Sequence, residues 1–133
     1  NSGMPKSPPI ARLKAVLNEQ LDLELAVLVG SQVEGGASPS SDWDIAIRWK
    51  RCVTPYQQLG KTETLRRLLA KNLELPEAQI DLVDLTSAGL AMRAVVAEEG
   101  LVLKGENTLP WHYFLERTWR DLESYYWDDV YAA

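Results

Sequence analysis

Two aspartates one residue apart, Asp42 and Asp44, directly precede an apolar segment of this 133-residue chain. Side chains alternate between the two faces of a strand, so both carboxylates would lie on the same face. Like charges on one strand face repel each other unless a cation or hydrogen-bond donors offset the repulsion. Mg²⁺ takes oxygen ligands, commonly a few carboxylates together with substrate phosphates. The pair therefore predicts a site for divalent metal ions.

A Gly-Ser pair, Gly30 and Ser31, ends an earlier apolar run, and ten residues separate Ser31 from Asp42. Glycine permits a tight turn, and exposed backbone N–H groups there, with the Ser31 hydroxyl, can hold phosphate oxygens. Taken alone, a Gly-Ser pair is usually only a turn, and Asp42 fits a turn as well. Together, the two motifs predict a metal-dependent phosphoryl or nucleotidyl transferase, in which two ions about 3.5–4 Å apart stabilise the attacking and leaving oxygens.

Apolar periodicity indicates the elements that must position these residues. Strands are predicted over 23–29, 43–49, 79–85 and 101–104. Helices are predicted over 10–21, over 55–73, from an N-cap at Thr86-Ser87 to about 99, and from Pro110 onward. This order predicts an α/β (α+β) domain, a small mixed β-sheet flanked by helices.

The same periodicity predicts which side chains form the core. The first helix would bury Ile10, Leu13, Leu17 and Leu21, the second Tyr56, Leu59, Leu65, Leu68, Leu69 and Leu73, and the last Trp111, Leu115, Trp119, Leu122 and Tyr126. The lone cysteine, Cys52, is expected to be a small buried hydrophobe. Surplus aromatic residues near the end of the chain, such as Trp127 or Tyr131, would instead suit a partner interface.

Other polar residues fit the site less well. Arg48 shares the face of the aspartates and would suit a phosphate, but a surface arginine at a strand end is the stronger interpretation. Ser38, Ser40 and Ser41 are better explained as a soluble loop than as triphosphate contacts. His112 is the only histidine, which argues against a zinc site or a histidine-based triad.

Composition narrows the possible partners and the compartment. The net charge of −5 argues against direct binding of nucleic acid or of a membrane surface. No apolar run approaches the roughly 20 residues of a membrane helix, and a single cysteine excludes an internal disulfide, so we expect a cytoplasmic protein. We expect residues 1–9 to be a tag remnant and a mobile lead, and 10–133 to form one domain.

The Gly-Ser and Asp-x-Asp motifs, with their spacing, resemble the signature of the DNA polymerase beta-like nucleotidyltransferase superfamily over about Leu23 to Leu103. The short length and the segment QIDLVDL, some 35 residues beyond Asp44, are most similar to minimal nucleotidyltransferases. Within these, the chain resembles the antitoxin of a HEPN-domain toxin. The resemblance implies the polymerase beta-like palm fold.

In that superfamily a third carboxylate on a later strand completes the metal site and accepts the proton of the attacking hydroxyl. We expect Asp81 in this role because it opens the third strand. Asp84 is the alternative, but three residues further along a strand it would face the opposite side. A solvated strand end for Asp81 and a turn or capping carboxylate for Asp84 are the structural interpretations.

The resemblance also implies an activity. An enzyme of this kind would transfer AMP from ATP, with two Mg²⁺ ions, to a protein hydroxyl, a tyrosine of the cognate HEPN ribonuclease. Gly30 and Ser31 would seat the β- and γ-phosphates, and Asp42, Asp44 and Asp81 would bind the metal. Two alternatives stay open: an antitoxin that acts by occlusion alone, and a small-molecule nucleotidyltransferase of the aminoglycoside type, for which no additional helical domain is evident.

Overall fold

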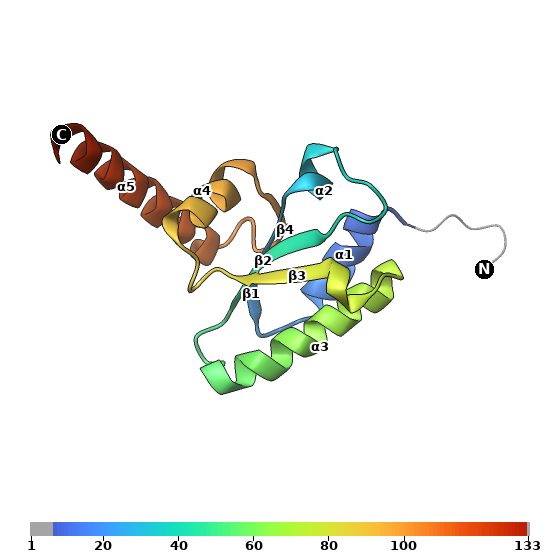
Figure 1. Ribbon diagram of the computed structural model, residues 1–133. Helices are drawn as coiled ribbons and strands as arrows, with labels where there is room; N and C mark the ends of the chain where they lie inside the picture. Colours follow the sequence, from blue (N-terminus) through green and yellow to red (C-terminus); the bar gives the residue numbers. More distant parts are fainter. Residues whose placement is uncertain (1–6, 133) are drawn as a thin grey trace.

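A computed structural model describes the backbone of residues 7–132 and the side chains of 7–128. The elements are α1 (Pro9–Asn18), β1 (Leu23–Val29), α2 (Ser31–Glu34), β2 (Trp43–Trp49), α3 (Pro55–Leu73), the short 3-10 helix η1 (Glu77–Gln79), β3 (Ile80–Asp84), α4 (Leu90–Glu99), β4 (Leu101–Lys104) and α5 (Leu109–Ala132). The predicted strands are all present, and the α/β fold class is confirmed (Figure 1).

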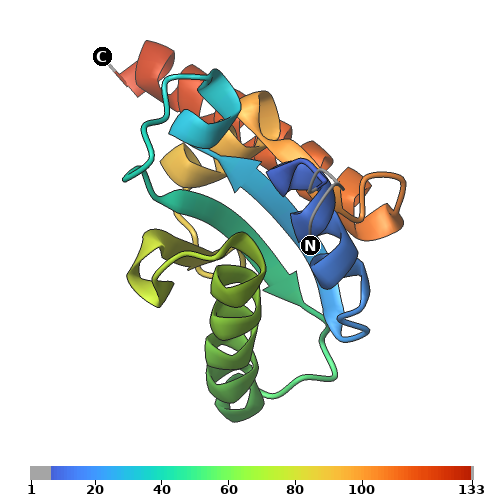
Figure 2. The same cartoon turned by 90° about the vertical axis from the view of Figure 1, so that its right-hand side faces the viewer.

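The four strands form one mixed sheet in the order β3-β2-β1-β4. β1 is antiparallel to both β2 and β4, whereas β2 and β3 are parallel. Helices α1 and α3 pack on one face, and α4 and α5 on the other (Figure 1). The short helix α2 lies at the end of the sheet where β1 ends and β2 begins (Figure 2).

Alternation along β2 fixes the register of the sheet. Ile45, Ile47 and Trp49 are buried against α1 and α3, whereas Ala46 is buried on the face of α4 and α5. A slip of one residue would move every side chain of β2 to the other face and carry Asp44 into the α1–α3 core. Because burying one large aliphatic side chain contributes about 1.5–3 kcal/mol, this register is strongly favoured.

Several predicted core positions are exposed. Helix α1 ends at Asn18, so Leu21 falls in the following turn and is 79% exposed. In α3 the buried side chains all belong to the second half of the helix, and Tyr56, Leu59 and Leu68 are exposed. These predictions were wrong because periodicity shows which face of a helix is apolar, but not how far its neighbours extend along it. Cys52, predicted to be buried, is also exposed, in the loop before α3.

The predicted start of α4 was wrong as well. The helix begins at Leu90 after an N-cap at Gly89, and Thr86 and Ser87 lie in the turn before it. In contrast, α3 begins with the capping pattern that its sequence favours. The Thr54 hydroxyl accepts from the Gln57 N–H at 3.2 Å, and the Gln57 amide oxygen accepts from the Thr54 N–H at 3.0 Å.

The C-terminal helix has two different parts. Near its start Trp111 and Phe114 are buried and stacked, with ring centroids 5.4 Å apart. Farther along, Trp119, Tyr126 and Trp127 are exposed, where the helix extends beyond the body of the domain (Figure 1). The prediction of a buried aromatic stripe was therefore wrong for Trp119 and Tyr126, and the side chain of Tyr131 lies outside the described residues. Within residues 7–132, no helix combines the length and apolar character needed to cross a membrane.

Candidate active site

The two predicted carboxylates Asp44 and Asp81 lie side by side. β2 and β3 are parallel, and their register pairs Asp44 with Asp81. Adjacent strands are about 4.8 Å apart and paired side chains share a face, so the two carboxylates are neighbours. Asp44 is half-buried, and Asp81 is exposed. Both carboxylates therefore occupy one face at the end of the sheet.

The electrostatic environment of Asp44 is unfavourable for a bare carboxylate. Burial raises the pKa of Asp44, and the charges of Asp81 and then Asp42 raise it further. A hydrogen bond between the carboxyl groups of Asp44 and Asp81 acts in the same direction. Asp42, one position before β2, is exposed. A divalent cation would relieve this repulsion, because its charge favours the ionised form of all three groups.

Gly30 is required where the backbone passes Asp44. Val29, the last residue of β1, pairs with Asp44, so the chain turns directly beside that carboxylate. Gly30 has φ +85°, a left-handed conformation that favours glycine, and a Cβ built on it would lie 2.7 Å from Asp44 Oδ2. Both the backbone angle and the lack of a side chain at this position therefore allow the carboxylate to reach the turn.

Ser31 is the first residue of the short helix α2. The sequence pattern predicted no helix between the strands 23–29 and 43–49. The N–H groups of Val33 and Glu34 bond to the Gly30 carbonyl, whereas the first N–H groups of a helix have no partner within it. Among the described residues, the Ser31 hydroxyl has no hydrogen-bond partner either, and the side chain is half-buried. Free donors therefore lie next to the carboxylates, as phosphate binding requires.

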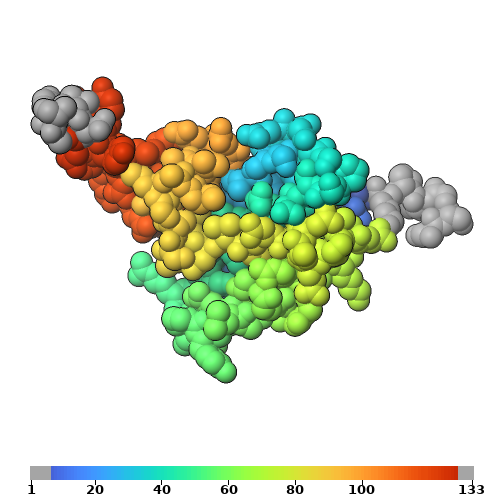
Figure 3. Space-filling view, viewed as in Figure 1, coloured from blue at the N-terminus to red at the C-terminus, as the bar shows by residue number. Residues whose placement is uncertain are grey.

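Two glutamines that the sequence did not single out hold the segment before Asp42. The side-chain amides of Gln32 and Gln79 both donate to the carbonyl of Ser41, each at 3.4 Å, and Gln79 also donates to that of Pro39 at 3.3 Å. Figure 3 shows this loop lying against the start of β3 on the surface. The local sequence pattern does not predict these contacts, and those of Gln79 join segments about forty residues apart.

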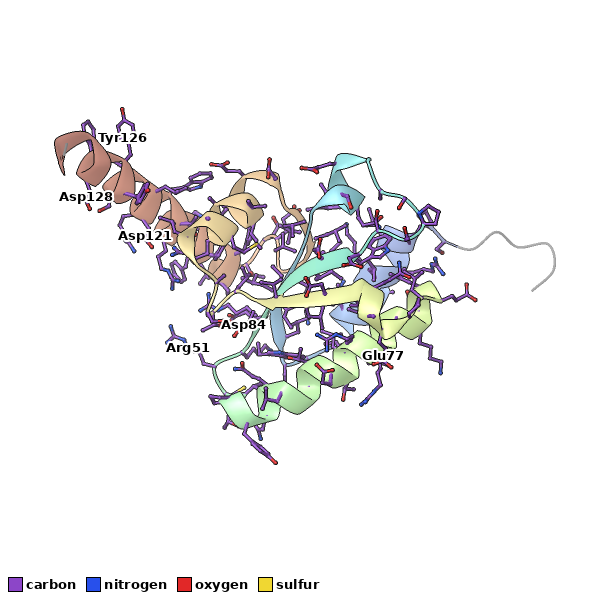
Figure 4. All side chains as sticks on the ribbon, viewed as in Figure 1. Arg51, Glu77, Asp84, Asp121, Tyr126 and Asp128 are labelled. Atoms are coloured by element: carbon purple, nitrogen blue, oxygen red, sulfur yellow. The ribbon has the colours of Figure 1, made fainter. Side chains whose placement is uncertain are left out.

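Asp84 lies at the other end of β3 and has a different environment. It pairs in register with Ile47, and its carboxylate accepts from the Thr86 N–H at 2.9 Å and from the Ser87 hydroxyl at 3.3 Å. In Figure 4 Asp84 lies where β3 turns toward α4. The carboxylate closes this turn, as an aspartate commonly does.

The remaining polar candidates also have structural roles. Arg48 forms an ion pair with Glu24, with 3.1 Å between Nε and Oε2, four residues along β2 from Asp44. The hydroxyls of Ser38, Ser40 and Ser41 bond to one another within the exposed loop. The His112 imidazole Nε2 lies 3.0 Å from Glu116 Oε1, four residues along α5. These contacts agree with the structural interpretation of each residue.

The donor set fits a hard divalent cation. Asp42, Asp44 and Asp81 offer only carboxylate oxygens, the ligands that Mg²⁺ favours. Burial, followed by the charges of Asp81 and Asp42, raises the pKa of Asp44. Within residues 7–128, no three His, Cys, Asp or Glu side chains are already arranged to hold a metal ion. Binding would therefore draw the exposed Asp42 and Asp81 toward Asp44.

Known structures share this arrangement of elements. A chain from a toxin–antitoxin complex with AMP-PNP is 26% identical, with a TM-score of 0.65, and the match covers 91% of this chain and 97% of that one. A chain from a point mutant of the toxin–antitoxin MntA-HpeT is also 26% identical, with a TM-score of 0.58 and coverage of 90% and 96%.

A third match shows the fold alone. It is a chain from the tri-AMPylated HEPN toxin of Shewanella oneidensis in complex with the MNT antitoxin, 24% identical, with a TM-score of 0.59 and coverage of 92% and 95%. None of the curated protein sequences matches this chain significantly.

The family comparison agrees with the geometry of the site. The family model described as "Polymerase beta, Nucleotidyltransferase" matches residues 11–108, which include Gly30, Ser31 and the three aspartates. The match spans most of the chain, from α1 to the turn before α5. This protein belongs to the polymerase beta nucleotidyltransferase family and is a nucleotidyltransferase.

Proposed function

We propose that the chain is an antitoxin that transfers AMP from ATP, with Mg²⁺, to a tyrosine hydroxyl of a cognate HEPN-domain toxin. The observation that carries the proposal is the pairing of Asp44 with Asp81 beside the turn at Gly30. This arrangement combines a carboxylate pair with a place for phosphate, which AMP transfer from ATP needs. Asp42 adds a third carboxylate at the same end of the sheet.

The choice of nucleotide and partner is supported by the structural matches. The chain with a TM-score of 0.65 comes from a toxin–antitoxin complex with AMP-PNP, an ATP analogue, and the match covers nearly all of both chains. The MntA-HpeT match, at the same identity, is also a toxin–antitoxin pair. The net charge of −5 supports a protein acceptor over a polynucleotide, because it would repel a phosphate backbone.

The proposed reaction joins the acceptor oxygen to the α-phosphorus of ATP. The tyrosine hydroxyl attacks that phosphorus, the bond from it to the bridging oxygen of the β-phosphate breaks, and pyrophosphate leaves. Asp81, exposed at the start of β3, accepts the hydroxyl proton. The amides at the start of α2 and the Ser31 hydroxyl hold the β- and γ-phosphates. Asp42, Asp44 and Asp81 would hold Mg²⁺, which would supply charge stabilisation of the transferred group.

The alternative is an antitoxin that blocks its partner without catalysis. The exposed aromatic side chains on the last turns of α5, Tyr125, Tyr126 and Trp127, favour partner binding of some kind. They do not explain a left-handed glycine placed against Asp44, which occlusion would not require. We therefore favour catalysis. The single, exposed Cys52 suits a reducing compartment, and we place the protein in the cytoplasm.

The proposal is tested with the product of the neighbouring gene as acceptor. The two proteins are incubated with ATP and Mg²⁺, and the acceptor's intact mass is measured. We expect one or more AMP adducts with the wild-type chain and none with the Asp42→Asn/Asp44→Asn double variant. If the double variant still neutralises the toxin fully, and the wild-type chain leaves no adduct on it, the occlusion alternative replaces this proposal.

A further inference from the structure

A cavity of about 620 Å³ lies at the opposite end of β2 from the carboxylates. Its walls include Glu24 of β1, Arg48 of β2, Arg51 in the following loop, and Tyr113, Phe114 and Arg117 of α5. A strand rises about 3.3 Å per residue, so Arg48 is roughly 13 Å from Asp44 along β2. The cavity is therefore separate from the candidate active site.

The cavity carries an excess of positive charge. Arg48 is neutralised by Glu24 at 3.1 Å. Arg51 and Arg117 are exposed, and neither makes a hydrogen bond or an ion pair with any side chain that the structure describes. Figure 4 shows Arg51 extending from the loop after β2. Two arginines without an ion-pair partner among the described residues thus line one cavity, in a chain whose net charge is −5.

Arg117 has one longer-range electrostatic neighbour on its own helix. Its charge lowers the pKa of Asp121, but the main cause of that lowering is the hydrogen bond from Arg93. Arg93 Nη2 lies 2.8 Å from Asp121 Oδ2, so that carboxylate is already paired. Arg117 therefore remains available to a ligand in the cavity.

The size and the lining of the cavity indicate the class of ligand. Its volume lies within the range of about 300–1,000 Å³ that is usual for small-molecule sites. Guanidinium groups bind phosphate through paired, charge-assisted hydrogen bonds. The floor includes the buried Phe114, and Tyr113, 58% exposed, offers a ring against which a planar group can stack.

We propose that this cavity binds a small phosphate-bearing molecule of the nucleotide class, independently of the metal site. Arg51 and Arg117 bind the phosphate groups, and Tyr113 stacks on the base. The site goes beyond the proposed AMP transfer and does not depend on it, because it shares no residue with the carboxylate end of the sheet. Since phosphate recognition here uses arginine alone, binding does not require a divalent cation.

The test is calorimetric titration of the full chain with inorganic pyrophosphate and with ADP, both in the presence of EDTA. We expect both to bind, and Arg51→Ala/Arg117→Ala to weaken both by about tenfold or more, because each charged hydrogen-bonding group is lost. Tyr113→Ala should weaken ADP by about three- to tenfold and leave pyrophosphate unchanged. The matched control is Arg67→Ala, an exposed arginine on α3 that lines neither site.

The Asp42→Asn/Asp44→Asn variant separates this proposal from the proposed function. It should bind pyrophosphate and ADP as the wild-type chain does in EDTA, even if the chain transfers no AMP. Failure of both probes to bind would overturn the proposal, as would an equal loss with Arg67→Ala. Binding of a single-stranded RNA but of neither probe would also overturn it, in favour of a macromolecular ligand.

Discussion

The aspartates at the two ends of β3 have different neighbours: one lies beside another carboxylate, and the other accepts hydrogen bonds. Asp81, near the start of the strand, is paired in register with Asp44, another carboxylate. Asp84, at its end, is paired with Ile47 and receives two hydrogen bonds from the turn that follows. Both aspartates are exposed, so exposure does not distinguish them.

The difference lies in the hydrogen-bond donors and the charges that surround each carboxylate. The Asp84 carboxylate accepts hydrogen bonds from the turn that follows it, and this turn explains its presence structurally. The pair at Asp44 and Asp81 has like charges as neighbours, and burial and those charges raise the pKa of Asp44. Two ionised carboxylates side by side cost free energy that a bound cation would offset. This contrast supports the proposed chemical role of Asp81 at one end of the strand and a structural role of Asp84 at the other.

The largest expected effect is loss of activity when Asp44 becomes an amide. Asp44→Asn keeps the shape of the side chain and removes the charge that would hold the metal. Charge stabilisation by a bound metal contributes several kcal/mol, so we expect AMP transfer to fall by about 1,000-fold. Initial rates of adduct formation, measured by mass spectrometry, check this. A loss of less than about tenfold would remove Asp44 from the metal site.

The comparison of the two ends is sharpened by matched substitutions on β3. Asp81→Asn should reduce the transfer rate by about 100-fold or more, the usual contribution of a general base, whereas Asp84→Asn should change it by only a few-fold. The same rate assay is used for both variants. The assignment fails if Asp84→Asn shows the larger loss, since Asp84 would then be the third carboxylate.

Alanine substitutions at Gly30 and Gly35 test the backbone turn beside Asp44. Gly30 and Gly35 both have φ +85°, but a Cβ meets Asp44 Oδ2 at 2.7 Å from Gly30 and nothing within 4 Å from Gly35. At Gly35, where ψ is 2°, alanine should cost about 1 kcal/mol of backbone strain. At Gly30, where ψ is −158°, it should cost more, because that backbone region is open essentially to glycine alone. Only Gly30→Ala should also lower activity, by about 10- to 100-fold, because it displaces a metal ligand. Equal activities would show that the contact is unimportant.

The smallest expected effects are changes in thermal stability, measured in the absence of divalent metal. A raised folded-state pKa means that the stability contributed by Asp44 falls as the pH rises through its usual range toward the raised value. In EDTA at neutral pH, Asp44→Asn should therefore melt at or slightly above the wild-type temperature, and the difference should vanish in acid, where Asp44 is protonated. Thermal denaturation followed by circular dichroism across this pH range checks the sign.

Asp84→Ala provides the opposite case in the same experiment. It removes two hydrogen bonds from the turn, so we expect the free energy of unfolding to fall by about 1 kcal/mol at neutral pH. A stabilised Asp84→Ala, or a clearly destabilised Asp44→Asn, would contradict the distinction between the two ends of β3.

The strands were predictable because their patterns are local. Two apolar runs bounded by Gly30 and Gly100, and the alternation of Trp43 to Trp49, set strand limits that the structure repeats. The residues of the proposed site were likewise predicted from local sequence, because Gly-Ser and Asp-x-Asp are short motifs at a defined spacing. The pairing of Asp44 with Asp81 was not, because parallel register depends on how α3 returns the chain to the sheet.

Other features depended on contacts between distant segments. Nothing near Gln79 indicates that its amide holds the carbonyls before Asp42, forty residues earlier for Pro39. The exposure of Leu21, Leu59 and Cys52 likewise depends on where neighbouring elements end. The sequence pattern thus predicted the strands and their motifs, but not the contacts between distant elements.

The most direct test of the central claim is metal binding itself. Mn²⁺ in place of Mg²⁺ is titrated into the full chain with a non-hydrolysable ATP analogue, and free Mn²⁺ is measured by electron paramagnetic resonance. We predict nucleotide-dependent binding by the wild-type chain, weakened by about 10- to 100-fold or more in Asp44→Asn and in Asp81→Asn, and unchanged in Asp84→Asn. Undiminished Mn²⁺ binding by Asp44→Asn would contradict the assignment of the carboxylate pair as the metal site.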